Sequence, residues 1–205
     1  MSVLFFRNVS LFPKEEYGFK EVTFKLEQRG RYYFQTKHSE QMNTLLGLLE
    51  GRYREFYGSI HQADRLTIQS DRLLLGEKVY SQTVEYWLAL KDDHFFFDGR
   101  RRSKYNYIQN FHCRGMRHLP IYKLRDEQKI KFALLALTFQ ESGLILLSQL
   151  LSMELTDLFK EHLEKLIQHS RCTVCVVQSL DNKEQNLDFQ QLASFETINL
   201  QNNRE

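Results

Sequence analysis

Two apolar runs, Leu144-Ile-Leu-Leu147 and Thr173-Val-Cys-Val-Val177, decide the fold class of this chain together with the segment that joins them. Each run is short and continuous, which is typical of a strand that is buried on both faces of a parallel sheet. Residues 156–170 form an amphipathic segment with Thr156 as a candidate N-cap. Its apolar residues are expected to face inward: Leu158, Phe159, Leu163, Leu166 and Ile167. A strand, a helix and a second strand make a βαβ unit, so the sequence predicts an α/β fold.

The N-terminal quarter predicts three strands and a helix. Residues 3–11 are rich in apolar and aromatic side chains, 19–27 alternate at period two, and 31–35 form a third, aromatic strand. Residues 14–18 supply a turn, so the first two strands are expected to pair as an antiparallel ribbon. A polar loop over 36–41 precedes a leucine-rich helix that ends at Gly51. A strand, a polar loop and a helix follow one another in the order found around a phosphate-binding loop.

The middle of the chain predicts an insertion. Short strands are expected over 57–75, a helical insertion over 83–119 and a helix over 124–139. We therefore expect one domain over 1–205, with a helical subdomain at approximately 83–140 inside it.

Composition narrows the class of protein. The 205 residues carry a net charge of +2, with 42% hydrophobic residues but only nine glycines and two prolines. These values exclude a fibrous, low-complexity or disordered chain, and they give no sign of a polyanionic partner. No apolar run approaches the ~20 residues that span a bilayer. Three cysteines, an odd number, fit a reducing compartment, so we expect an intracellular protein.

Taken together, these segments resemble the nucleotide-binding domain of ABC transporters over nearly the whole chain. Residues 4–11, 19–27, 44–51 and 57–60 are similar to the opening strands, first helix and return strand of that family. Residues 123–131 resemble the segment with its signature sequence, 144–149 its Walker B strand and 174–179 the strand that ends at its switch histidine. The resemblance implies a P-loop-type α/β core with an antiparallel β-subdomain and a helical subdomain insertion.

The segment that resembles the phosphate-binding loop lacks the chemistry of one. A P-loop needs glycines to curl its backbone around phosphates, a lysine to neutralise them and a hydroxyl to bind Mg²⁺. By the resemblance, Met42 stands for the lysine and Asn43 for the hydroxyl, while Glu40 adds a negative charge. The degenerate loop comprises Thr36, Lys37, His38, Ser39, Glu40, Gln41, Met42, Asn43 and Thr44. Lys37 and His38 could hold some other anion, but we expect they do not.

Three further catalytic positions are also changed. By the resemblance, Ser148 replaces the aspartate that orients the metal, Gln149 replaces the general-base glutamate, and Ser179 replaces the switch histidine. A glutamine can accept a hydrogen bond from water but cannot take its proton. Together these changes remove metal ligation, base catalysis and γ-phosphate sensing, so no ATP hydrolysis is expected.

The segment that resembles the signature is altered as well. The positions are Leu124, Arg125, Asp126, Glu127 and Gln128. Carboxylates at the expected glycine positions repel a triphosphate, so the chain is not expected to complete a partner's site by the usual geometry. The glutamine by which the family contacts its membrane subunit cannot be placed, because Leu75 or Gly76 occupies that position.

Phe95, Phe96, Arg100, Arg101 and Arg102 are the candidate partner-binding residues. Three interpretations stay open: a solvated turn, a contact with a membrane subunit or lipid headgroups, and a nucleic-acid patch with stacking aromatics. The resemblance favours the membrane subunit among the functional interpretations.

Two cysteine and histidine groups have spacings that occur in metal sites. Cys172 and Cys175 lie inside a predicted strand, where side chains at i and i+3 point to opposite faces, so core cysteines are expected. A second group, which lacks a regular ligand spacing, comprises His94, His112, Cys113 and His118. We predict no metal site.

These observations predict a catalytically inactive nucleotide-binding-domain subunit, a pseudo-ATPase, that is peripheral on the cytoplasmic side of a membrane. Its expected partners are an integral membrane subunit and a second nucleotide-binding-domain chain, identical or different, with no nucleic acid. No cofactor is expected, and ATP with Mg²⁺ could bind only by non-standard contacts. Two alternatives remain open: a non-hydrolytic ATP-binding subunit of an asymmetric transporter, and a soluble adaptor or nucleic-acid-binding module that uses residues 100–104.

Overall fold

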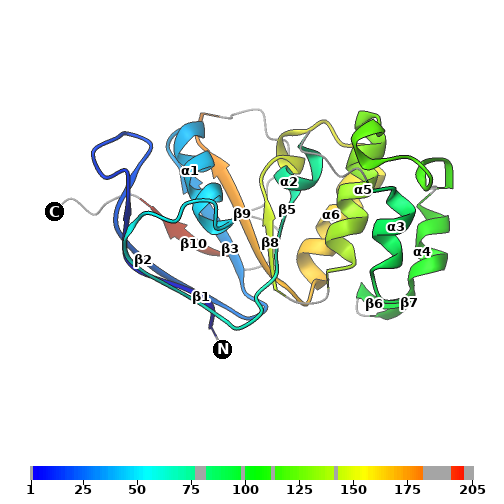
Figure 1. The fold of residues 1–205 in the computed structure, drawn as a ribbon, viewed down its shortest axis with the longest axis horizontal. Coiled ribbons are helices and arrows are strands. Elements are labelled where there is room, and N and C mark those ends of the chain that lie inside the picture. The colour runs from blue at the N-terminus through cyan, green and yellow to red at the C-terminus, as the bar shows by residue number, and fades with distance from the viewer. Residues whose placement is uncertain are drawn as a thin grey trace.

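The computed structural model describes residues 2–76, 82–97, 100–111, 114–140, 143–181 and 195–200. The elements lie in three groups along the long axis of Figure 1. An antiparallel sheet lies at one end, a parallel sheet lies in the middle, and most of the helices lie at the other end.

The antiparallel sheet contains β1 (Ser2–Leu11), β2 (Phe19–Glu27) and β4 (Tyr57–Gln62), in the order β2-β1-β4. The pairing of β1 with β2 runs from Ser2 opposite Glu27 to Leu11 opposite Phe19. This register confirms the predicted antiparallel ribbon. Phe6 and Phe24 stack across the two strands with ring centroids 4.4 Å apart, so the apolar face of the ribbon points into the molecule.

The central sheet is parallel and has five strands in the order β10-β3-β9-β8-β5. The strands are β10 (Glu196–Asn199), β3 (Arg31–Thr36), β9 (Thr173–Ser179), β8 (Leu144–Leu147) and β5 (Ile68–Ser70). Adjacent positions of β8 and β9 confirm that the two apolar runs form neighbouring parallel strands. Strand β10 has no counterpart among the strands predicted from the sequence.

Helices cover both faces of this sheet, as continuous apolar strands require. One face packs against α1 (Ser39–Leu49) and the antiparallel sheet, and the other against α5 (Asp126–Thr138) and α6 (Asp157–His169). Cys175 belongs to the first core and Cys172 to the second, and both side chains are buried. The prediction of core cysteines on opposite faces is confirmed.

The remaining elements form the part farthest from the antiparallel sheet in Figure 1. They are α2 (Asp71–Leu75), α3 (Val84–Ala89), β6 (His94–Phe97), β7 (Arg100–Ser103), α4 (Lys104–Asn110) and short 3₁₀ turns at 114–116, 121–123 and 150–152. The expectation of a wholly helical insertion over 83–119 is corrected, because β6 and β7 pair as an antiparallel hairpin.

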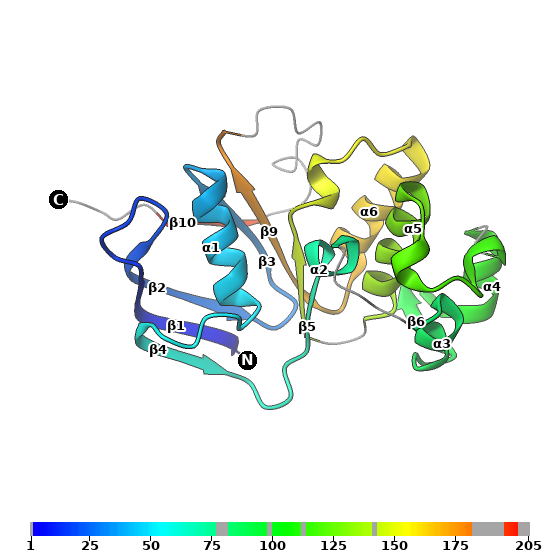
Figure 2. The ribbon, with the colours of Figure 1, turned by 45° about the horizontal axis from the view of Figure 1, so that its top comes forward.

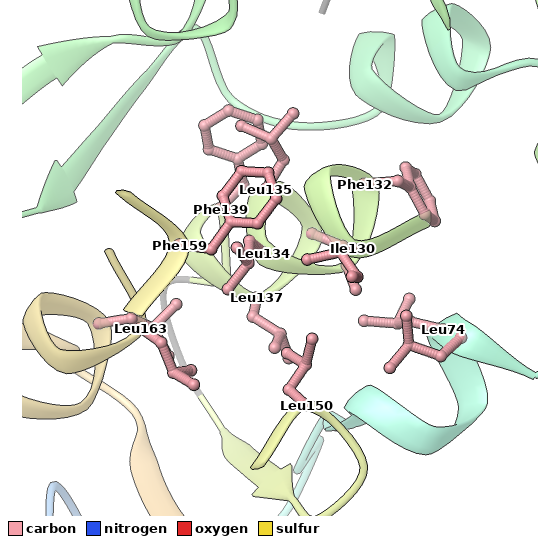
Figure 3. Packing of buried hydrophobic residues seen from close by; sticks show 14 of the residues in the cluster. Leu74, Ile130, Phe132, Leu134, Leu135, Leu137, Phe139, Leu150, Phe159 and Leu163 are labelled. Atoms are coloured by element: carbon pink, nitrogen blue, oxygen red, sulfur yellow. The ribbon is translucent and has the colours of Figure 1, made fainter. Parts of the chain in front are cut away.

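Helix α5 is the centre of this part. Seven consecutive residues, 132–138, are buried, because α2, α6 and the 3₁₀ turn after β8 surround the helix (Figure 3). Helix α6 is amphipathic as predicted, but Leu158 is 57% exposed and does not belong to its buried stripe. Within the described residues, no helix combines the length and the apolar character needed to cross a membrane.

Candidate functional site

The carboxyl ends of four parallel strands meet at one edge of the central sheet, which is where open α/β sheets bind ligands. At this edge β3 ends in Thr36, β9 in Ser179 and β5 in Ser70, while Ser148 follows β8. All four hydroxyl side chains are buried. Ser148 and Ser179, two of the positions that the resemblance marked as catalytic, therefore both lie at this edge, and each has a neutral hydroxyl group.

The connection between β3 and α1 is much shorter than the predicted loop over 36–41. Only Lys37 and His38 separate the two elements, because α1 begins at Ser39. The backbone N–H of Lys37 donates to Oε1 of Gln41 at 3.0 Å, and the Thr36 hydroxyl donates to the backbone oxygen of Gln178 at 3.1 Å. The side chains of Thr36 and Gln41 therefore stabilise this connection through hydrogen bonds to backbone groups.

A polar pair links the connection between β3 and α1 to the residues that follow β9. His38 Nδ1 lies 3.0 Å from Oδ2 of Asp181, which follows β9, and both side chains are about half exposed. An anion at Lys37 and His38 would have to compete with the Asp181 carboxylate and with Glu40 in the first turn of α1.

Helix α1 turns its polar face toward α2. Nη1 of Arg72 donates to Oδ1 of Asn43 at 2.9 Å, and Nη2 of Arg72 lies 2.8 Å from Oε2 of Glu50. The Glu50 side chain is 1% exposed, so this ion pair is shielded from water. Asn43, at the expected Mg²⁺-binding position, uses its oxygen to bind α2.

Asp71 is the feature of this edge that the sequence analysis missed. It follows β5 directly and is completely buried. Its Oδ2 accepts from the backbone N–H groups of Ser148 and Leu150, both at 2.8 Å, and its Oδ1 accepts from the Ser148 hydroxyl at 3.2 Å. Burial raises the pKa of Asp71 to about 6, although these hydrogen bonds favour the charged form. An aspartate directly after a short predicted strand and just before the apolar residues Leu73, Leu74 and Leu75 was the signal that could have revealed it.

The remaining residues at this edge also differ from those that the resemblance implies. Gln149 is exposed, and its backbone oxygen accepts from the Ser152 hydroxyl at 2.9 Å. Within the described residues, the buried Oγ atoms of Ser70 and Ser179 have no hydrogen-bond partner. Leu75 is buried in α2 and Gly76 ends that helix, so neither supplies a polar group in place of the expected glutamine.

The segment that resembles the signature forms the N-terminus of α5. Asp126 and Glu127 lie in its first turn, where carboxylates stabilise the helix dipole. Oε1 of Gln128 accepts from the backbone N–H of Arg125 at 3.0 Å, and Glu127 forms an ion pair with Lys131 at 2.9 Å. Leu124, just before them, is buried. The acidic residues thus have a structural role in this helix.

The candidate partner-binding residues separate into core and surface. Phe95 is 2% exposed, and its ring packs against Tyr107 and Phe139 with centroids 5.1 and 4.7 Å away. The prediction that Phe95 contacts a partner is corrected, because the hairpin turns this side chain into the core. Arg100 and Arg101 are exposed on β7, and Arg102 is partly buried. The side chain of Phe96 lies outside the described residues.

The candidate metal ligands are spread over separate elements. His94 is exposed on β6, and His118 pairs with Glu85 at 2.9 Å, while His112 and Cys113 lie outside the described residues. Over the ranges that the structure describes, no three His, Cys, Asp or Glu side chains form a group that could hold a metal ion.

No family model matches the chain, and no curated protein matches it in sequence. Solved structures do match. The chain superposes on an ATP-binding protein described as a cobalt transport protein with a TM-score of 0.64 and 14% identity, over 96% of this chain and 76% of the other. The chain has the fold of ABC-transporter ATP-binding proteins.

Two other structures agree with this assignment of the fold. An ABC-transporter ATP-binding protein from Pyrococcus furiosus matches with a TM-score of 0.60 and 13% identity over 96% of both chains. A chain of an inward-facing transporter, described as of the metal-chelate type, matches with a TM-score of 0.56 and 16% identity over 86% of this chain and 74% of the other. At these identities the likeness concerns the ABC-type fold alone.

Proposed function

We propose that this chain is a catalytically inactive ABC-type nucleotide-binding-domain subunit, with a structural or regulatory role in a transporter-like membrane complex at the cytoplasmic face. The observation that carries the proposal is the two-residue connection between β3 and α1. Ser39, Gln41 and Met42 lie in the first turn of α1, so these positions of the expected phosphate-binding loop cannot take part in an encircling loop. Met42 adds no positive charge.

The groups around this connection support the same conclusion. Asn43 binds Arg72, and the Ser148 hydroxyl binds Asp71, so neither oxygen is directed to a metal. Asp71 is itself held by three donors in a completely buried place. Gln149 is an amide and cannot serve as a general base. In the part of the chain that the structure describes, these contacts support the loss of Mg²⁺ ligation and of water activation in the usual way.

Calorimetric titration with ATP, with and without Mg²⁺, tests the loss of nucleotide chemistry. We expect no binding with a dissociation constant below about 1 mM, which corresponds to roughly 4 kcal/mol. Binding below that value would favour the non-hydrolytic subunit instead. Steady turnover by the purified chain that Gln149→Ala abolishes would refute the proposal.

The proposed partners are an integral membrane subunit and a second nucleotide-binding-domain chain. Arg100 and Arg101 supply exposed positive charge on β7 for such a contact. Affinity purification from native membranes should recover a membrane protein with the unmodified chain, and recover less of it with Arg100→Glu/Arg101→Glu. Lys14→Glu/Lys20→Glu changes two exposed cations near the other end and is the matched control.

Two results of the purification contradict the proposed assembly. Recovery of no membrane protein removes the transporter-type partner. Recovery of nucleic acid, with an association that weakens steeply as salt rises, supports the soluble nucleic-acid-binding module instead.

A further inference from the structure

A cavity of about 360 Å³ lies between α3 and α4, far from the sheet edge described above. These two helices lie side by side at the end of the molecule opposite the antiparallel sheet in both Figures 1 and 2. The volume is that of small-molecule sites, which run from roughly 300 to 1,000 Å³. Its lining includes Glu85, Leu88, Asp93, Lys104, Ile108 and Arg117.

The wall of the cavity is apolar over much of its area. Leu88 and Ile108 are buried and come from the facing sides of α3 and α4, while Ala89 and Tyr105 border solvent. Such a wall gains free energy from an apolar body that displaces water, about 25 cal/mol for each Å² that is covered. The cavity therefore favours a ligand with a hydrocarbon or aromatic part.

Lys104 brings a fixed positive charge to the cavity. Its Nζ donates to the backbone oxygens of Leu88 at 3.0 Å and Lys91 at 2.6 Å, near the C-terminus of α3. The Lys104 side chain is only 12% exposed, whereas its ionic partner Asp93, 3.3 Å away, is 89% exposed. The two carbonyl groups hold the ammonium in place, so an incoming anion can replace the solvated Asp93 carboxylate without moving it.

Arg117 brings the second positive charge. Its Nη2 lies 2.7 Å from Oε1 of Glu85, whose other oxygen pairs with His118. A guanidinium group has five N–H donors in a planar fork, and the ion pair with Glu85 uses one of them. Since the Arg117 side chain is 34% exposed, its other donors remain accessible to a carboxylate in the cavity.

We propose that this cavity binds a small organic anion with an apolar body, whose carboxylate is held by Lys104 and Arg117 while its body lies against Leu88 and Ile108. The site uses no residue of the sheet edge or of the exposed β7 arginines. It is therefore independent of the proposed function.

Octanoate is the probe, and 1-octanol and octylamine are its neutral and cationic counterparts. Binding is followed by calorimetry and by the fluorescence of Trp87, the only tryptophan, which precedes Leu88 in α3. We expect octanoate to bind at least about tenfold more tightly than either counterpart, because a hydrogen bond to a charged group contributes roughly 1.5–3 kcal/mol. Equal binding of octanoate and octylamine, or no binding of octanoate at about 10 mM, overturns the proposal.

Two variants break the same ion pair and should have opposite effects. Arg117→Gln removes an anchor and should weaken octanoate binding about tenfold, whereas Glu85→Gln removes a competing carboxylate and should strengthen it several-fold. Asp93→Asn should strengthen it as well. If loss of the Arg117–Glu85 pair acted only through the structure, both variants would change octanoate binding in the same direction. That outcome would contradict the proposal.

A third variant tests the place of the apolar body. Ala89→Phe fills the cavity from the exposed end of α3 and should abolish octanoate binding, with thermal unfolding used to verify that the variant is folded. Leu90→Phe enlarges the adjacent exposed side chain, which does not line the cavity, and is the matched control. Unchanged octanoate binding by a folded Ala89→Phe variant would place the ligand elsewhere and overturn the assignment.

Discussion

Asp71 and His162 are two buried titratable residues whose effects on stability oppose each other. Burial raises the pKa of Asp71 to about 6 and lowers that of His162 to about 3. Burial keeps the His162 ring neutral. The Tyr107 hydroxyl lies 2.8 Å from its Nδ1 and the Thr138 hydroxyl 2.8 Å from its Nε2. Thr138 donates its own hydrogen to Leu134, so Nε2–H of the ring donates to Thr138 and Nδ1 accepts from Tyr107.

The pH dependence of Asp71→Asn tests this opposition. A raised folded pKa gives Asp71 a contribution that is present below pH 4 and lost as pH rises through 6. A lowered folded pKa gives His162 a contribution that is present above pH 6.5 and lost as pH falls toward 3. The slopes, up to about 1.4 kcal/mol per pH unit each, cancel between pH 4 and 6. Urea unfolding should be nearly independent of pH there in the unmodified chain.

Removing Asp71 should expose the effect of His162. The free energy of unfolding of Asp71→Asn is expected to rise with pH between 4 and 6, at a slope up to about 1.4 kcal/mol per unit. The variant also loses about 1–3 kcal/mol at all pH values, because an amide cannot accept all three hydrogen bonds. A flat profile for the variant would show that His162 does not titrate as its burial requires.

At the scale of elements, Arg31 joins the start of β3 to the end of α6. Its guanidinium donates to the backbone oxygens of Ile167, Ser170 and Cys172 at 2.5, 2.6 and 2.8 Å. These carbonyl groups lie at or just after the C-terminus of α6, where they lack partners within the helix. Arg31→Met should therefore lower the free energy of unfolding by roughly 2–4 kcal/mol.

Chemical unfolding of Arg31→Met and Lys20→Met measures this contribution. Lys20 is exposed on β2, so its substitution is expected to change stability by less than about 0.5 kcal/mol. Arg31→Lys should fall between them, because an ammonium group keeps the charge but has three donors in place of five. Equal stability of Arg31→Met and Lys20→Met would contradict a stabilising role for the Arg31 hydrogen bonds.

Gly143 and Gly51 both have positive φ values, 106° and 72°, but differ in the space around them. A Cβ at Gly143 would lie 2.2 Å from the backbone oxygen of Thr67, whereas a Cβ at Gly51 would meet nothing within 4 Å. Gly51→Ala should cost about 1–2 kcal/mol from backbone strain alone. Thermal unfolding should show a larger loss for Gly143→Ala, and equal losses would mean that the close contact is easily relieved.

For the molecule as a whole, hydrophobic periodicity predicted most elements, but it missed the β6–β7 hairpin and the contacts of Asp71. The strands β8 and β9 and the helices α5 and α6 follow from local pattern, and they were predicted. The hairpin β6–β7 was not, since three consecutive phenylalanines show no alternation. Once the strand forms, its pleat puts Phe95 and Phe97 on one face, and both are buried. The acceptor role of Asp71 depends on a strand 77 residues away.

The parallel sheet and the helical part share one apolar core, which predicts that they unfold together. That core contains Leu74, Phe132 and Leu163 from α2, α5 and α6, and Val176 from β9.

Phe132→Ala removes a fully buried ring packed against Trp87 and should cost about 3–5 kcal/mol. Leu158→Ala, at a 57% exposed position of α6, should cost much less. Trp87 fluorescence reports on the helical part and far-ultraviolet circular dichroism on the whole chain, so the two urea transitions should coincide for each variant. Separate midpoints would divide the chain into two folding units.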